Sequence, residues 1–149
     1  MADYKPAFTA EYKTIIRESH LDTFGHVNNA AYLTLFEEAR WEFITERGYG
    51  LERVQQLRQG PTILEVKLQF LRELANRNRI TIRSWATGQS RMVATMRQVI
   101  VKENGEEACV ADFTFAFFDL STRRAIPPTE EWCLAIGISP IPPTPLEGK

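Results

Sequence analysis

The chain has 149 residues, of which 44% are hydrophobic and 25% are charged, and its formal net charge is −1. This length suits one domain, which buries roughly 68–70% of its unfolded surface and needs no disulfide or metal to hold it together. The balanced charge argues against nucleic acid as a partner, two cysteines form no disulfide framework, and no apolar run is long enough to span a membrane, so we expect a cytoplasmic globular domain.

The first part of the chain predicts one strand and two helices. Residues 8–17 alternate between apolar and polar side chains, which is typical of a half-buried strand. A long helix is predicted over residues 29–47, because aromatic residues recur at helical spacing and Asn28 or Asn29 can cap its start. A shorter helix over residues 51–58 is expected to stop at Gly60-Pro61.

The rest of the chain predicts four strands in succession and a tail. The strands are expected at residues 64–70, 79–88, 91–103 and 107–119. Asn104-Gly105 favours a tight hairpin, and the last strand is apolar on both faces, as in a central strand that is covered on both sides. The tail holds six of the eight prolines, which predicts an extended end. We therefore expect a folded domain over residues 1–125 and a proline-rich tail over residues 126–149.

This order of elements predicts an α+β fold with a five-stranded antiparallel sheet and one long helix. One helix covers only one face of such a sheet, so apolar surface is left over for a second copy of the chain. The pattern therefore predicts a homo-oligomer.

Both histidines lie in one stretch, His20-Leu-Asp-Thr-Phe-Gly-His-Val-Asn-Asn29, directly before the long helix. Backbone N–H groups and the positive end of the helix dipole point out of a helix N-terminus, so such a site can hold a developing oxyanion. Asp22 lies a few residues upstream, where its carboxylate can act on an electrophile held there. From the residues alone, a turn-closing role for Asp22 is favoured over catalysis, and a metal site with His20 and His26 is a further alternative. The lack of a CxxC or HExxH motif and of further histidines disfavours the metal.

The stretch from His20 to Tyr32, together with Phe36-Glu-Glu-Ala-Arg-Trp41, resembles the hotdog-fold acyl-CoA thioesterases. The similarity is to the 4-hydroxybenzoyl-CoA thioesterase-like branch and, within it, to bacterial long-chain acyl-CoA thioesterase III, and it covers residues 8–120. It implies a sheet wrapped around the long helix and a homodimer with two shared active sites, or a homotetramer. It also implies no metal and no cofactor other than the coenzyme A of the substrate.

By position, the resemblance makes Asp22 the nucleophile or general base and the backbone N–H near Asn29 the donor to the thioester oxygen. His20 and His26 belong to the same motif and are further catalytic candidates without an assigned step. An aspartate and one oxyanion donor can suffice, because coenzyme A thiolate is a good leaving group. The resemblance thus implies hydrolysis of a medium- to long-chain fatty acyl-CoA to the free acid and coenzyme A.

Substrate contacts are expected from the motif and from one basic turn. The motif contributes Gly25, Asn28 and Tyr32, of which the resemblance places Tyr32 near the acyl pocket. Ser90-Arg91, at the start of a strand, is the candidate for the phosphates of coenzyme A.

Two other functions remain open from the sequence: a dehydratase or hydratase of acyl thioesters on the same fold, and a non-catalytic module that binds acyl-CoA or an acyl carrier. Related hotdog branches place a catalytic carboxylate on the long helix, so Glu37 and Glu38 are second-choice catalysts.

Overall fold

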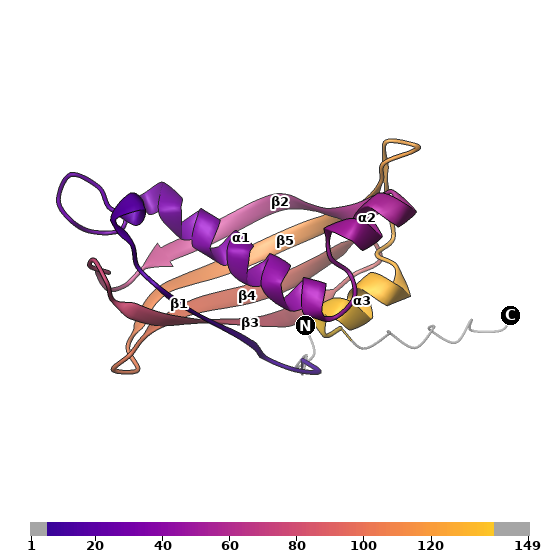
Figure 1. The fold of residues 1–149 in the computed structure, drawn as a ribbon. Helices are drawn as coiled ribbons and strands as arrows, with labels where there is room; N and C mark the ends of the chain where they lie inside the picture. The colour runs from indigo at the N-terminus through magenta and orange to yellow at the C-terminus, as the bar shows by residue number, and fades with distance from the viewer. Residues whose placement is uncertain (1–5, 139–149) are drawn as a thin grey trace, which may run out of the picture.

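An antiparallel sheet carries one long helix across its face in the computed structural model, which describes residues 6–138 (Figure 1). The strands are β1 Ala10–Ile15, β2 Gln59–Phe70, β3 Arg79–Gln89, β4 Val93–Lys102, β5 Glu107–Asp119 and β6 Arg124–Ile126. The helices are α1 Asn29–Glu46, α2 Leu51–Leu57 and α3 Glu130–Ile136, with a short 3-10 turn, η1, at Glu18–His20.

The strand order across the sheet is β1-β3-β4-β5-β2, and all neighbours are antiparallel. β4 pairs with β5 up to Ala116, opposite Val93, and β6 pairs with the next residues of β5 from Phe117. β6 therefore continues the line of β4 along the same side of β5. β5 is therefore bonded on both sides, as predicted for a central strand. Within residues 6–138, β1 and β2 each pair with a single strand and form the two edges of the sheet.

α1 packs on the face of the sheet that we call the inner face (Figure 1). Its buried residues recur at helical spacing: Tyr32, Leu35, Phe36, Ala39, Phe43 and Ile44. Phe36 is fully buried and meets Phe113 of β5 edge-on, with 6.0 Å between the ring centroids. Each large apolar side chain contributes roughly 1.5–3 kcal/mol by leaving water, so this stripe holds α1 against the sheet.

One polar side chain is buried between α1 and the sheet. Gln98 of β4 is 0% exposed, and its amide nitrogen donates to the Phe36 carbonyl oxygen (3.0 Å) and to Ser84 Oγ (2.9 Å). Its amide oxygen accepts a hydrogen bond from Arg40 Nη1 (2.9 Å). The Arg40 guanidinium also lies 4.4 Å from the ring centroid of Phe113, and burial lowers the pKa of Arg40 to about 10. Gln98 thus forms hydrogen bonds with a helix carbonyl, a hydroxyl and a half-buried cation at once.

The chain after β5 folds back onto the core, which the sequence did not predict. β6 makes the sheet six-stranded rather than five-stranded, and α3 lies within the segment expected to be a tail. Trp132 of α3 is 1% exposed, and its ring lies 5.3 Å from that of Phe117 in β5. Thr129 caps α3 by accepting a hydrogen bond from the Trp132 N–H (3.4 Å). The predicted extended end of the tail, residues 140–149, lies outside the described residues.

β2 differs from its prediction in two ways. It begins at Gln59, so Gly60-Pro61 lies inside the strand rather than breaking the chain before it. Proline is tolerated there because β2 is an edge strand, where not every N–H has a partner. A β-bulge between Ile63 and Glu65 makes Leu64 an extra residue, so the strand predicted over residues 64–70 alternates regularly only beyond the bulge.

The other predicted elements agree to within a few residues. The first strand is shorter than residues 8–17, whereas α1 and the hairpin at Asn104-Gly105 are confirmed, with Gly105 at a φ of +89°. No helix among residues 6–138 is long and apolar enough to cross a membrane.

Replacing Gln98 by leucine is expected to lower the free energy of unfolding by about 2–4 kcal/mol, because buried Ser84, the Phe36 carbonyl oxygen and half-buried Arg40 lose a hydrogen-bond partner. Urea unfolding followed by circular dichroism measures the change. The matched control is Gln55→Leu on the exposed side of α2, where we expect a change within about 0.5 kcal/mol. Equal effects in the two variants would show that the Gln98 bonds contribute nothing specific.

Candidate active site

The segment between η1 and α1 folds into a tight turn around the Asp22 side chain. Asp22 Oδ1 accepts hydrogen bonds from the backbone N–H groups of Phe24 (2.8 Å) and His26 (3.2 Å). The Asp22 N–H donates to the His26 carbonyl oxygen (2.8 Å), and Gly25 has a φ of +82°, which glycine adopts at little cost. Asp22 therefore does close a turn. Its other oxygen, Oδ2, makes no hydrogen bond to the described part of the chain.

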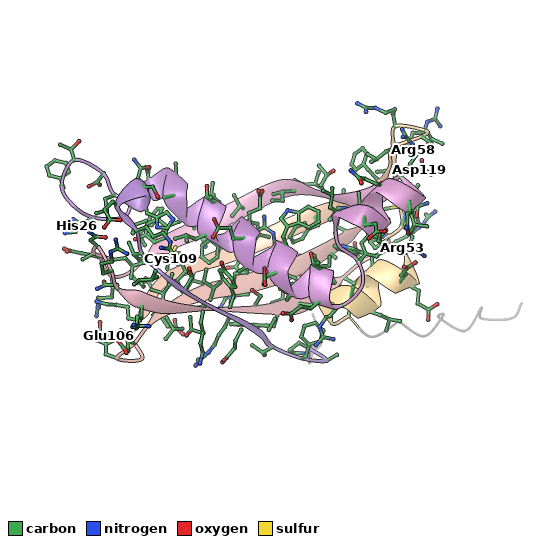
Figure 2. All side chains as sticks on the ribbon, viewed as in Figure 1. His26, Arg53, Arg58, Glu106, Cys109 and Asp119 are labelled. Atoms are coloured by element: carbon green, nitrogen blue, oxygen red, sulfur yellow. The ribbon has the colours of Figure 1, made fainter. Side chains whose placement is uncertain are left out.

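The turn is fixed to the connection between β2 and β3, residues 71–78. The Val27 N–H donates to the Leu74 carbonyl oxygen (3.0 Å), and His26 forms a β-bridge with Ala75. His26 Nε2 lies 2.8 Å from Glu73 Oε2, at the end of the molecule that carries the His26 label in Figure 2. Both side chains are largely exposed, so this contact orients the imidazole more than it stabilises the fold.

α1 begins directly after the turn and leaves one backbone donor free. Asn28 is the N-cap, and its side chain accepts a hydrogen bond from the Ala30 N–H (2.9 Å). The Asn29 side chain accepts from the same N–H (3.1 Å), and the Ala31 N–H donates to the Asn28 carbonyl oxygen (2.9 Å). The Asn29 N–H has no acceptor within residues 6–138. It is thus available to a bound oxygen at the positive end of the helix dipole.

Asp22 and Asn29 line the same open cavity of about 410 Å³, between the turn, the start of α1 and the end of β2. Tyr32 forms part of its wall, and its ring meets Phe70 edge-on at 5.1 Å between centroids. Burial above all, with smaller contributions from Cys109 and Asp22, raises the pKa of Tyr32 to about 12, so the phenol stays protonated at neutral pH. The other lining residues are His26, Val27, Leu71, Arg72 and Glu73.

Three residues of the motif support this cavity from outside its lining. The His20 Nδ1 accepts a hydrogen bond from the Arg17 N–H (3.0 Å) at the edge of η1. Gly25 forms the tip of the turn, and Asn28 caps α1. These three residues hold the turn and the start of α1 in place and do not line the cavity.

The predicted phosphate contact lies far from this cavity within one chain. Ser90 and Arg91 follow β3 at its far end. Phe70 of the cavity is aligned across the sheet with Ile82 of β3, and Ser90 is eight residues further on, about 26 Å at 3.3 Å per residue.

The second-choice carboxylates also lie away from the cavity. Glu37 and Glu38 are about 12–14 Å from Asn29 along α1, at 1.5 Å per residue. Glu37 lines a separate apolar cavity of about 300 Å³, which α1, β2 and α3 enclose with other elements of the core.

The sequence did not predict one wall of the cavity, which is formed by the end of β2 and the connection after it. Phe70 ends β2, and Leu71, Arg72 and Glu73 follow it; Phe70 and Leu71 expose large apolar side chains. No local motif marks these residues, because only the pairing of the two connections brings them to the Asp22 turn.

The arrangement offers a free carboxylate oxygen and a free N–H donor to one bound group. Such a pair suits attack on an acyl carbon whose oxygen accepts the hydrogen bond. Within residues 6–138, no group of three or more histidine, cysteine, aspartate or glutamate residues is arranged to hold a metal ion.

Comparison of the sequence with known proteins gives one family. A family model described as the thioesterase-like superfamily matches residues 16–142. The long-chain acyl-CoA thioesterase FadM of Escherichia coli is 30% identical over 112 residues, which cover 74% of this chain and 84% of FadM. The chloroplastic acyl-acyl carrier protein thioesterase ATL3 of Arabidopsis thaliana is 29% identical over 80 residues, which cover 54% of this chain and 42% of ATL3.

The fold is also found in solved structures. YbaW from Escherichia coli, described as a probable thioesterase, superposes with a TM-score of 0.77 at 26% identity, covering 86% of this chain and 96% of that chain. The predicted hotdog fold, a sheet wrapped around one long helix, is confirmed.

Proposed function

This chain belongs to the thioesterase-like superfamily and is a thioesterase, and we propose that it hydrolyses a medium- to long-chain fatty acyl-CoA to the free acid and coenzyme A. In this proposal Asp22 is the nucleophile or the general base, and the Asn29 N–H stabilises the oxyanion. No metal and no cofactor take part, apart from the coenzyme A of the substrate.

One observation carries the proposal: the free Asp22 oxygen and the free Asn29 N–H belong to residues that line the same cavity. A positioned oxyanion donor typically contributes about 2.7–4 kcal/mol, and a general base about 10²–10⁴-fold in rate. A thioester needs little more, because the thiolate leaves readily without a dedicated acid.

Two routes are compatible with this geometry. As a general base, Asp22 takes a proton from water, which attacks the acyl carbon while the carbonyl oxygen becomes an oxyanion at the Asn29 N–H. As a nucleophile, Asp22 attacks the acyl carbon directly and forms an anhydride that water then hydrolyses. In both routes the C–S bond breaks, and the coenzyme A thiolate leaves and takes up a proton.

A fatty acyl chain has an apolar route along α1. Leu33 and Trp41 are exposed on α1 two helical turns apart, and Trp41 lines the cavity of about 300 Å³ together with Ile63 of β2. Phe70 of β2 is also exposed and belongs to the Asp22 cavity. Both cavities lie between α1 and β2, so these exposed apolar side chains belong to the two elements that an acyl chain would follow, which supports a chain longer than a few carbons.

The edge strand β2 supports the homo-oligomer. β2 has 12 residues and offers its outer N–H and C=O groups to no other strand among the described residues. A long edge with exposed Ile63, Leu64 and Phe70 is a template for pairing with another strand. A second copy at this edge lies next to the Asp22 cavity and narrows it, so we propose a homodimer through β2, alone or within a homotetramer.

The function is tested by thiol release from acyl-CoA substrates in a buffer that contains EDTA. The substrates run from butyryl-CoA to palmitoyl-CoA, with benzoyl-CoA as the aromatic comparison. We expect kcat/KM to rise at least about 10-fold along the fatty series, because each buried CH₂ contributes about 0.8 kcal/mol. A requirement for a metal, or the highest value with benzoyl-CoA, would contradict the proposal. Water addition to an enoyl-CoA without thiol release would favour a hydratase, and binding without turnover a binding module.

Asp22→Asn is expected to lower kcat by at least about 10²-fold, because the amide keeps the turn but is neither a base nor a nucleophile. The matched control is Asp119→Asn. Asp119 Oδ1 accepts hydrogen bonds from the backbone N–H groups of Ser121 (2.8 Å) and Thr122 (3.1 Å), so it closes the same kind of turn at the other end of the sheet. Steady-state hydrolysis and a thermal melt are measured for both variants. A folded Asp22→Asn protein with more than about a third of the wild-type kcat would refute the assignment.

In solution the protein is expected to have at least twice the 17.1 kDa mass of one chain. Leu64→Lys places a charge in the middle of the β2 edge, so it is expected to shift the protein toward the monomer. Leu134→Lys, on the exposed side of α3, is the control and leaves the mass unchanged. Light scattering coupled to gel filtration gives the masses, and a wild-type monomer at micromolar concentration contradicts the prediction.

A further inference from the structure

A groove on the surface of the sheet collects positive charge. It has a volume of about 610 Å³ and is formed by β1, β3 and the hairpin between β4 and β5. Its charged lining residues are Lys13, Arg17, Arg79, Arg83, Lys102 and a single carboxylate, Glu103. We call it the basic groove.

Most of this charge is not neutralised nearby. Arg83 forms an ion pair with Glu11 at 3.3 Å. Among the described residues, the other four cations of the groove have no carboxylate oxygen within 4.0 Å. The whole chain carries a net charge of only −1, so the groove is a local excess of one sign. A concave surface with such an excess focuses the field and attracts anionic partners.

The basic groove opens on the outer face of the sheet. Tyr12 and Ile82 are paired across β1 and β3 and pack against the core, whereas Lys13 and Arg79 occupy the alternate positions of these strands. β1 and β3 also lie at the edge of the sheet opposite β2 (Figure 1). A dimer that pairs through β2 therefore leaves the groove open.

The basic groove lies at the same end of the sheet as the Asp22 cavity. Arg17 lines the groove, and its N–H donates to His20 of the catalytic motif (3.0 Å). The Arg77 N–H donates to the Ile16 carbonyl oxygen (2.8 Å), and Arg77 belongs to the same connection as Glu73 of the cavity. Two adjoining loops thus connect the groove with the cavity.

The charges of the basic groove are spread rather than convergent. Arg83 lies four positions after Arg79 on β3, about 13 Å away, and β1 lies about 10 Å from β4. A phosphate site uses donors that converge on one group of oxygens. Exposed cations over an area of this size instead match the acidic surface of a protein.

We propose, on the basis of the proposed thioesterase function, that the basic groove docks an acidic carrier protein. The carrier presents the acyl thioester on a phosphopantetheine arm, which passes over the two loops into the Asp22 cavity. The chemistry at the thioester is the same as with acyl-CoA, and only the group that carries the thiol differs.

The experiment compares three decanoyl thioesters, those of an acidic acyl carrier protein, of coenzyme A and of pantetheine, in the wild type and in a Lys13→Glu/Arg79→Glu variant. We expect kcat/KM for the carrier-protein substrate to fall at least about 10-fold at low ionic strength and less at high salt. For the two small thioesters, kcat/KM of the variant is expected to stay within about twofold of the wild-type value, because steering by exposed charges acts mainly on the large acidic partner. Arg123→Glu/Arg124→Glu, the same charge change at the opposite end of the sheet, is the matched control and keeps the wild-type values.

Docking is also measured without turnover, by titrating fluorescent unacylated carrier protein with each variant. A weaker Kd for the groove variant alone supports the proposal. If kcat/KM of the groove variant falls equally with decanoyl-CoA, the groove binds the nucleotide and the proposal is overturned. Unchanged kcat/KM values, or an equal fall for all three thioesters, would also overturn the proposal. If the wild type hydrolyses none of the thioesters, the proposed function fails, and the titration still decides on the groove.

Discussion

The packing of α1 on the inner face of the sheet determines the position of the proposed active site. Six buried side chains press the helix onto the strands, and Gln98 binds the Phe36 carbonyl oxygen, which fixes the helix along its axis as well as against the sheet. The first turn of α1 is thereby held beside the end of β2. A donor on such a rigid element keeps its direction better than a donor on a loop.

In the proposed function, Asp22 gives one turn structure two purposes. Its Oδ1 accepts two backbone hydrogen bonds, as Oδ1 of Asp119 does in the turn between β5 and β6. For Asp119, those backbone bonds lower the pKa of the carboxyl group, and the residue closes an exposed turn. Asp22 differs in what surrounds it, because a helix start with a free N–H lies on the same cavity. The role of the carboxylate therefore depends on its neighbours rather than on its own hydrogen bonds.

The predictable features of the chain are those with a strong local pattern. A few residues are enough to predict the strands from their alternation, the start of α1 from its capping asparagines, and the hairpin from Asn104-Gly105. β6 and α3 were not predicted because they have only three and seven residues, too few to show a clear periodicity. β6 is stabilised by pairing with β5, and α3 by the burial of Trp132. Half of the candidate site, Asp22 and Asn29, was visible in one motif. The other half, the end of β2 and the connection after it, depends on pairing between segments more than forty positions apart.

The β-bulge in β2 constrains how this protein can change in length. Before the bulge, Pro61 and Ile63 pair with the inner-face residues of β5, and beyond it Val66 and Phe70 do, so the extra residue shifts the inward positions from odd to even numbers. Deleting Leu64 itself would remove the bulge and keep both halves of the strand in register, whereas deleting one residue between Glu65 and Phe70 with the bulge retained would turn the end of the strand over. Phe70 would face the outer side, and the wall of the Asp22 cavity would be lost with it. Variation among descendants of this sequence should accordingly replace the exposed residues of β2 while keeping the number of residues between the bulge and Phe70 unchanged.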